Sequence, residues 1–109
     1  MSNPVIDTFG NKEWRNVDGV LHREDGPAII LSSGSTLYYR DGKLHRLDGP
    51  AVELANGSKS WYLNGKLHRE DGPAIEWANG SKEWYLNDKW YTEEEYVMIQ
   101  FMNGVNVYG

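Results

Sequence analysis

The sequence has no cysteine among its 109 residues, and this absence removes several classes of function. A disulfide framework, a thiolate zinc site and a thiol nucleophile all need cysteine. The lack suits a reducing compartment. No apolar run approaches the length of a membrane span, and the first residues lack the basic start and apolar stretch of a signal peptide. We therefore expect a cytoplasmic protein that does not bind membranes.

Basic residues are also scarce. The chain carries 11 lysines and arginines against 16 acidic residues, a formal net charge of −5. Tight binding to a phosphate backbone normally requires a basic stripe, because counterion release supplies most of the affinity. Direct nucleic-acid binding is therefore not expected, whereas an acidic surface can approach a basic partner.

Phenylalanine is rare, with two residues, but tryptophan and tyrosine are abundant, with five and seven. Both side chains combine an apolar body with a polar group, and they suit half-buried sheet faces and binding surfaces alike. Hydrophobic residues make up 39% of the chain, which is enough for a modest core. We expect one domain, residues 1–109.

A 23-residue repeat dominates the sequence. His22, His45 and His68 begin similar segments, of which the second and third agree at 17 of 23 positions. We divide the domain into an N-terminal cap and half-repeat, three full repeats, and a C-terminal helix and tail: 1–21, 22–44, 45–67, 68–90 and 91–109. Such a period indicates stacked copies of one supersecondary unit.

Each repeat predicts about two short strands. Asn79-Gly80, and Asp41-Gly42 and Asn64-Gly65 between the later strands, favour type I′ turns, in which both central residues have positive φ. Thr92 followed by three glutamates predicts a capped helix that ends at Asn103-Gly104 and packs on the last repeat. The expected fold is an all-β repeat: a single antiparallel meander sheet of hairpin repeats with a short C-terminal capping helix. The tail from Val105 could add a strand.

Alternation along the strands predicts two aromatic rows that point to opposite faces. Tyr38, Trp61 and Trp84 form one row, and the next residues, Tyr39, Tyr62 and Tyr85, form the other. Both faces carry apolar residues, so the sequence does not reveal which one is exposed.

The segment WYLNGKLHREDGPAIEWANGS (61–81) is similar to the MORN repeat, which has an aromatic residue, Asn-Gly-Lys, a histidine two residues later and a second Asn-Gly. His-Arg-x-Asp-Gly-Pro-Ala departs from the usual shorter stretch and resembles the MORN-like variant of phage and bacterial proteins. The resemblance covers residues 13–90. It implies scaffolding, dimerisation or occasional lipid binding, an antitoxin-like role, or a phage-encoded inhibitor of a host defence protein of the anti-CRISPR kind, acting in the host cytoplasm.

The three histidines are the most tempting chemical site. Each is followed three residues later by an aspartate, but equivalent side chains should lie about 9–10 Å apart, too far to share one metal ion. We interpret these residues as turn-bracing groups. The serines flank turn glycines, and Glu93, Glu94 and Glu95 suit a helix start. We expect no enzymatic activity, no metal and no cofactor.

The function expected from the sequence is a non-enzymatic protein-binding module that recognises a host protein through one aromatic face with a polar rim. The predicted partner-binding residues are Trp61, Tyr62, Trp77, Trp84, Tyr85, Glu53, Glu76 and Glu83. Trp14, Trp77 and Trp90 break the repeat pattern and are candidates for specialisation, although Trp90 could instead seat the helix. Two alternatives stay open: a small-ligand or nucleotide-sequestering protein, and an antitoxin-like or structural scaffold. The apolar C-terminal helix also predicts a homodimer.

Overall fold

The computed structural model describes residues 3–108, which form short strands followed by one helix. The termini of the single domain expected from the sequence, residues 1–2 and 109, lie outside this range. The elements are β1 (Val5–Ile6), β2 (Lys12–Glu13), β3 (Ile29–Ile30), β4 (Thr36–Leu37), β5 (Tyr39–Arg40), β6 (Lys43–Leu44), β7 (Val52–Glu53), β8 (Lys59–Ser60), β9 (Tyr62–Leu63), β10 (Lys66–Leu67), β11 (Ile75–Glu76), β12 (Lys82–Leu86), β13 (Lys89–Tyr91) and α1 (Glu93–Met102).

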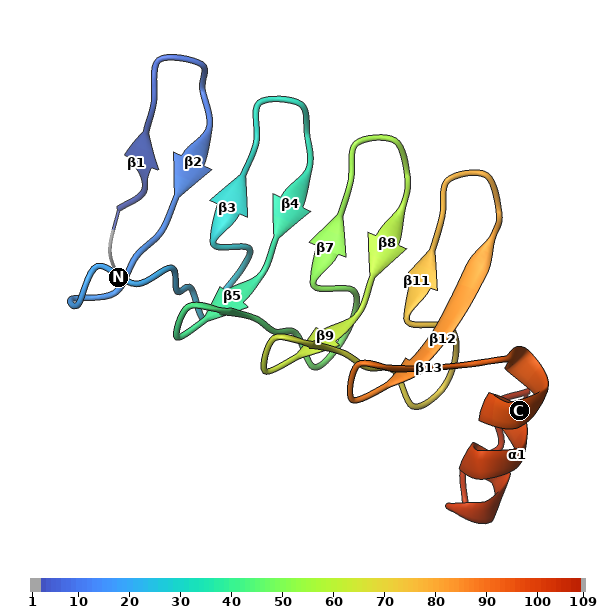
Figure 1. Cartoon of the computed structure of the whole chain (residues 1–109). Helices are drawn as coiled ribbons and strands as arrows, with labels where there is room; N and C mark the ends of the chain where they lie inside the picture. The colour runs from blue at the N-terminus through green and yellow to red at the C-terminus, as the bar shows by residue number, and fades with distance from the viewer. Residues whose placement is uncertain (1–2, 109) are drawn as a thin grey trace.

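The strands form two tiers of hairpins (Figure 1). The upper tier is an antiparallel meander in the order β1-β2-β3-β4-β7-β8-β11-β12, continued by β13. The lower tier consists of the hairpins β5–β6, β9–β10 and β12–β13. This arrangement confirms the predicted all-β meander with a C-terminal helix.

The expectation of two strands per repeat was wrong, because the first two full repeats each contain four. The break falls at Tyr38 and Trp61, where the backbone changes partner. The N–H of Tyr38 donates to Ala51 in the upper tier, whereas its C=O accepts from His45 in the lower tier. Within residues 3–108, no further hairpin follows the third repeat, and β12 there runs unbroken from Lys82 to Leu86.

The two tiers use different turns. Asp41 and Gly42 both have positive φ, 51° and 79°, as do Asn64 and Gly65, so the lower-tier turns are the predicted type I′. In the upper tier only the glycine is left-handed, for example Gly80 at 91°. The type I′ prediction for Asn79-Gly80 was therefore wrong. A three-residue loop, closed by the bond from Trp77 N–H to Ser81 C=O, needs just one left-handed residue.

Neighbouring upper hairpins are joined by one recurring side-chain bond. A backbone N–H at the start of one turn donates to a side-chain oxygen at the end of the preceding turn. The three bonds are Ser32 N–H to Asn11 Oδ1 (2.7 Å), Ala55 N–H to Ser35 Oγ (2.8 Å) and Ala78 N–H to Ser58 Oγ (2.9 Å). Ser35 and Ser58 are buried.

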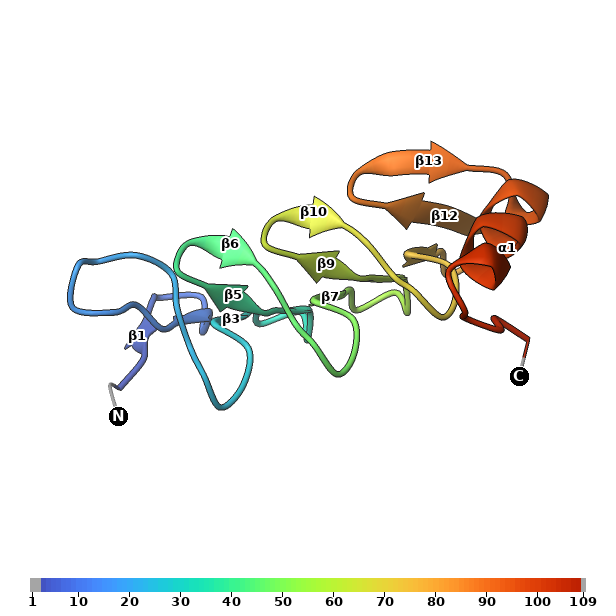
Figure 2. The same ribbon diagram turned by 90° about the horizontal axis from the view of Figure 1, so that it is seen from below.

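Little of the chain is buried. Its accessible surface is 6991 Å², whereas a compact protein of this mass exposes about 6200 Å². Its radius of gyration is 15.5 Å, against about 13 Å for a compact domain of this length. The buried apolar residues are Trp14, Ala28, Ala51, Ala74 and Tyr96. The molecule is therefore an elongated, single-layered sheet, whose lower hairpins project to one side (Figure 2).

The predicted helix is confirmed as α1, with Thr92 as its N-cap and a complete capping box to Glu95. It packs on the loop of the third repeat through Tyr96, whose hydroxyl donates to Arg69 C=O and accepts from Gly72 N–H at 3.2 Å, and through Gln100, which donates to Glu70 C=O at 2.8 Å. Residues 105–108 form no strand, contrary to the expectation, because Val105 N–H bonds back to Gln100. Within residues 3–108, no helix is long and apolar enough to cross a membrane.

Candidate functional site

The upper sheet has two faces with different structural roles. Cross-strand pairs such as Ile29↔Leu37 and Thr36↔Glu53 assign each side chain to a face, because paired residues point the same way. We call the face of Ala28, Ala51 and Ala74 the loop face, since the three His-Arg-x-Asp-Gly-Pro loops return across it. We call the face of Ile29, Val52 and Ile75 the open face.

On the loop face, each repeat stacks an arginine on an aromatic ring. The guanidinium carbon lies 3.8 Å from the ring centroid of Trp14 for Arg23, 4.0 Å from Tyr38 for Arg46, and 3.8 Å from Trp61 for Arg69. A glycine covers the other side of each guanidinium: a Cβ built on Gly72 would lie 2.9 Å from the guanidinium carbon of Arg69. This cation–π stack explains why the aromatic position and the loop glycine recur together.

The same arginines also close the loops. Arg69 donates from Nε to Asp71 at 3.1 Å, and from one terminal nitrogen to Pro73 C=O and to Glu76 at 3.1 and 2.9 Å. Arg46 repeats the bonds to aspartate and to proline, and lies 3.6 Å from Glu53. The arginines are therefore engaged within the fold.

The histidines brace turns, as the sequence predicted. Nδ1 accepts the backbone N–H of the first residue of each lower turn, from Asp41 to His22 at 2.9 Å, from Asn64 to His45 at 3.0 Å and from Asn87 to His68 at 3.0 Å. These turn residues have positive φ. Among residues 3–108, no three histidine or acidic side chains are grouped as metal ligands.

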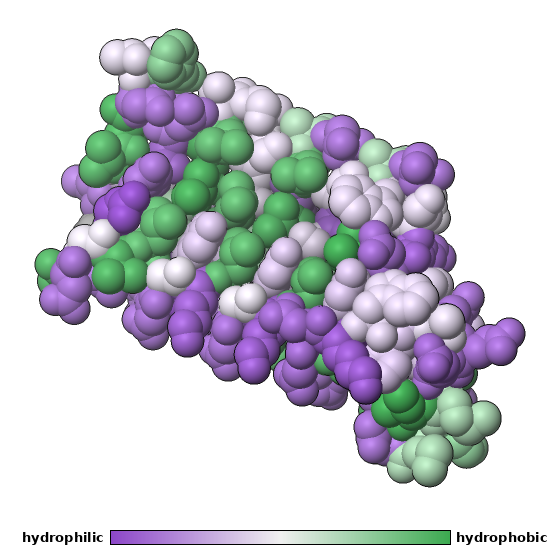
Figure 3. Space-filling model, in the orientation of Figure 1, coloured by the Kyte–Doolittle hydropathy of each residue, from purple (hydrophilic) through white to green (hydrophobic). Residues whose placement is uncertain are grey.

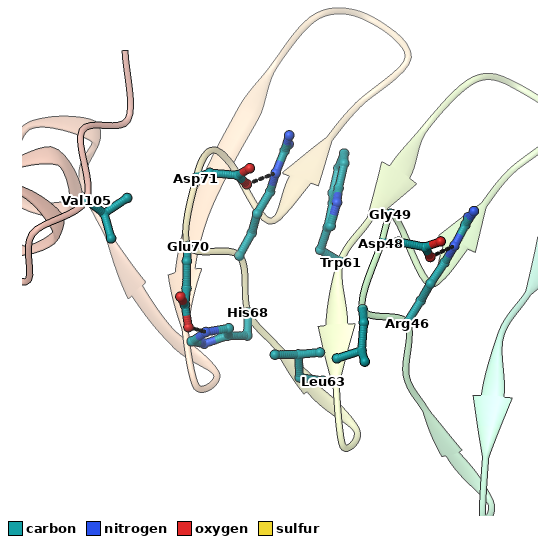
Figure 4. A pocket seen from close by; sticks show the side chains of 11 residues that line it. Arg46, Asp48, Gly49, Trp61, Leu63, His68, Glu70, Asp71 and Val105 are labelled. Atoms are coloured by element: carbon teal, nitrogen blue, oxygen red, sulfur yellow. Dashed lines mark hydrogen bonds and ion pairs between the residues drawn. The ribbon is translucent and has the colours of Figure 1, made fainter. Parts of the chain in front are cut away.

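An open cavity of about 730 Å³ lies between the second and third loops (Figure 4). Trp61, His68 and the two stacked arginines line it, with Leu47 and Val105 at its rim. Its positive charges are already paired with Asp48 and Asp71. An anionic ligand would therefore have to displace these internal partners.

The open face presents a band of aliphatic side chains that no other element covers (Figure 3). Cross-strand pairing places Leu37, Val52 and Ile75 on it, and period-2 alternation adds Leu31, Leu54 and Trp77. These residues stay partly accessible to solvent. Contiguous apolar side chains of this kind make the open face a candidate interaction surface.

The third repeat adds a polar-aromatic cluster at one end of this face, formed by Trp77, Glu83, Tyr85 and Trp90, which we call the aromatic cluster. Trp77 Nε1 donates to Glu83 at 2.6 Å, and the Tyr85 hydroxyl donates to its other carboxylate oxygen at 3.3 Å. Trp90 pairs with Tyr85 across β12 and β13. Trp77 and Trp90 are nevertheless 44% and 54% exposed.

Two members of the aromatic cluster break the repeat, and a third, Glu83, stands at a position that differs in every repeat. Trp77 replaces Leu31 and Leu54, Glu83 replaces Leu37 and Ser60, and Trp90 replaces Leu44 and Leu67. The three substitutions are separate in sequence but are linked through Tyr85 and the Glu83 carboxylate. This convergence distinguishes the third repeat from the other two.

The row of Tyr39, Tyr62 and Tyr85 runs along the lower tier from its first hairpin to the aromatic cluster. Burial raises the pKa of Tyr62, and the negative charge of Asp88 and the neighbouring Tyr39 raise it further. Burial also raises the pKa of Tyr85, followed by the charge of Glu83 and its hydrogen bond. The predicted ladder of Tyr39, Tyr62 and Tyr85 is therefore present, in a locally negative field.

The residues predicted to form one binding surface lie on opposite faces. Tyr62, Trp77, Glu83 and Tyr85 are on the open face, whereas Trp61, Trp84, Glu53 and Glu76 are on the loop face, where Glu53 and Glu76 pair with arginines. The prediction of a single surface was wrong because adjacent residues of a strand point in opposite directions.

Of the three tryptophans predicted to be specialised, Trp14 has the role of Tyr38 and Trp61, since Arg23 stacks on it. Trp90 belongs to the open face and lies on β13, which contacts α1, while Tyr96 and Gln100 anchor the helix to the loop of the third repeat. The predicted binding set omitted Trp90, although its pairing with Tyr85 across the last turn could have identified it. Comparisons with protein-family models, curated proteins and solved structures found no match to the chain.

Proposed function

We propose that this chain is a non-enzymatic protein-binding module and that a partner protein covers its open face. The observation that carries the proposal is the convergence of two repeat-breaking residues, Trp77 and Trp90, with Glu83 on an uncovered apolar face. An exposed tryptophan that is held in place by a hydrogen bond, as Trp77 is, resembles the anchors that dominate protein interfaces.

The face supports binding in two further ways. The bonds to Glu83 hold the rings of Trp77 and Tyr85 in place before a partner arrives, which lowers the entropy lost on association. The aliphatic band beside them supplies apolar area, and the surplus of acidic over basic residues favours a partner with a basic surface.

On the MORN-like resemblance alone, we further propose that the partner is a bacterial host protein, met in the cytoplasm, and that the chain is a phage-encoded inhibitor of host defence of the anti-CRISPR kind. The inhibitory effect would come from covering a surface of that partner, because the proposal gives the chain no chemistry of its own.

The decisive experiment is affinity purification of the tagged chain from bacterial lysate, with mass spectrometry and light scattering on the eluate. The test variant is Trp77→Ala with Trp90→Ala, and the matched control is Leu47→Ala, an exposed apolar residue on the rim of the loop-face cavity. Loss of one anchor typically costs about 2 kcal/mol or more, which is roughly thirtyfold in Kd.

We expect a stoichiometric partner with the wild type and with Leu47→Ala, and its loss from the double variant. An eluate that contains only the chain itself would contradict the proposal. A small-ligand function would then be tested by thermal shift with a panel of nucleotides, since a ligand that binds only the folded state raises Tm. Arg46→Ala would report on the loop-face cavity in that assay.

A further inference from the structure

The two ends of the sheet are finished differently, and the difference points to a second interaction surface. At the C-terminal end, α1 lies beyond β13 in the direction in which the repeats would continue (Figures 1 and 2). Lys82 and Glu83 also place charged side chains on the last upper strand. Charges and covering elements are common devices that keep a sheet edge from pairing.

At the N-terminal end, no helix covers the sheet edge within the described residues, and the one charged side chain is held inside a turn. Strand β1 is the terminal strand of the sheet, and β2 is its one neighbour among the described residues. Its side chains Val5 and Ile6 are 68% and 58% exposed, and Phe9 at the adjoining turn is 79% exposed. Asp7 is the one charged side chain of this edge, and it is occupied by the N–H groups of Phe9 and Asn11.

The outward backbone groups of β1 follow from its pairing with β2. The N–H of Asp7 donates to the C=O of Asn11, toward β2. Backbone groups alternate along an antiparallel strand, so those of Val5 also face β2, whereas the N–H and C=O of Ile6 face away from it. The internal repeats show which further groups face outward. The C=O of Ala28 and the N–H of Ser32 bond to the preceding hairpin. Their equivalents on the first hairpin are the C=O of Pro4 and the N–H of Thr8.

We propose that β1 is a self-association edge, on which the β1 strand of a second copy pairs antiparallel about a two-fold axis at Ile6. The outward groups are self-complementary in this register. Ile6 exchanges N–H and C=O with its counterpart, and each Thr8 N–H donates to Pro4 C=O of the other copy. The missing N–H of Pro4 does not weaken this pairing, because the equivalent residue of each internal junction contributes its C=O, as Ala51 does to the N–H of Tyr38.

The shortness of β1 does not argue against this pairing. Every internal junction of the upper tier, such as β4·β7 and β8·β11, is also made by two residues per strand. Antiparallel pairing about an axis perpendicular to the sheet also keeps the open faces of both copies on the same side. The dimer therefore carries one continuous open face with an aromatic cluster at each end.

Head-to-tail stacking is the competing arrangement. It would match Thr8 N–H with Ser81, the fourth member of the row that contains Ser35 and Ser58. However, it would bring the edge of β1 toward the end of the sheet where α1 packs, and it would assemble open chains of copies. The two-fold arrangement is closed and leaves α1 free.

The chain has no cysteine, so single introduced cysteines report the register directly. In the two-fold dimer, Ile6→Cys places two sulfurs at a directly opposed pair whose Cα atoms lie about 5.5 Å apart, within the range that a disulfide spans. We expect Ile6→Cys to form a disulfide-linked dimer under mild oxidation, and a mixture of Thr8→Cys and Ser81→Cys chains to form none. We also expect sedimentation equilibrium of the wild type to approach twice the 12.5 kDa chain mass.

Ile6→Lys should abolish the dimer, because it sets two like charges opposite each other, whereas Leu47→Lys, also exposed, should leave it intact. Circular dichroism would establish that both variants are folded. A chain that is monomeric at every concentration, or cross-linking of Thr8→Cys to Ser81→Cys in place of Ile6→Cys, would overturn the proposal. These outcomes are independent of whether the open face binds a partner.

Discussion

At the residue scale, each loop histidine must present an unprotonated Nδ1, because that atom accepts a backbone N–H. The three bonds fix the N–H of turn residues that have positive φ, such as Asp41 at 51°, and so add to the local preference of Asp and Asn for this conformation. Protonation of Nδ1 replaces the acceptor with a second donor and breaks the bond.

His45 gives this requirement a measurable pH dependence. Burial lowers the pKa of His45 below its usual 6.5, and the nearby Arg40 lowers it further. The unfolded chain therefore binds this proton more readily than the folded chain, so stability is complete above pH 6.5 and declines as the pH falls below it. We expect Tm to decline as the pH falls below 6.5, and the His45 ring resonances in NMR to titrate below 6.5.

The control is His45→Asn, which keeps an oxygen acceptor but does not titrate. Its Tm should depend less on pH over the same range than that of the wild type. A His45 ring that titrates at or above 6.5 would contradict the effect of burial and Arg40 on its pKa, and an identical slope in the variant would show that His45 does not set the pH dependence.

At the element scale, few polar contacts hold α1 on the loop of the third repeat. Removal of a single hydroxyl group therefore tests how the helix is anchored. The Tyr96 hydroxyl bonds to Arg69 C=O and Gly72 N–H, and its ring is fully buried. Tyr96→Phe leaves both backbone groups without their partner, a loss of about 1–3 kcal/mol. Urea unfolding should report this loss, and hydrogen exchange at Gly72 should accelerate.

Tyr108→Phe is the matched control for this change. It also removes a tyrosine hydroxyl that bonds to α1, here to Glu93 at 2.5 Å, but the side chain is exposed. We expect a change of less than about 0.5 kcal/mol, as for most surface substitutions. Equal losses in the two variants would mean that the loop of the third repeat does not anchor the helix.

The elements also show where sequence reasoning succeeds. Thr92 with Glu95 predicts the start of α1, and Asp41-Gly42 predicts its turn, because both signals lie within a few neighbouring residues. The split of each repeat into two tiers was not predictable in this way. It depends on Tyr38 bonding upward to Ala51 and downward to His45, and those partners come from separate segments of the chain.

The candidate site was predictable in part for the same reason. Repeat-breaking positions identify Trp77 and Trp90, but alternation alone cannot tell which face the loops cover, since both faces carry apolar residues. The stacking of Arg69 on Trp61 decides that question, and it depends on a loop that returns across the sheet.

At the scale of the whole molecule, the structure is a chain of nearest-neighbour junctions. The same pairing joins β4 to β7 and β8 to β11, and the same serine bond reinforces both junctions. The stability of such an array is approximately the sum of its units and of the interfaces between them. Removing one complete repeat should therefore shorten the molecule without changing the fold of the rest.

Deletion of residues 45–67 tests this view, because it joins Leu44 to His68 and lets Ser35 accept the N–H of Ala78. We expect a folded chain that keeps the aromatic cluster and its partner, with a smaller free energy of unfolding. The urea m value should fall by roughly a fifth, since 23 of 109 residues are removed and m scales with the surface exposed on unfolding. Deletion of residues 46–67, one residue fewer, leaves a second histidine in the loop before β11. Either this loop distorts, or β11 pairs with β4 one position out of register and turns its apolar side chains to the other face. That variant should be less stable than the 45–67 deletion, and two deletions of equal stability would show that the register between repeats does not determine the structure.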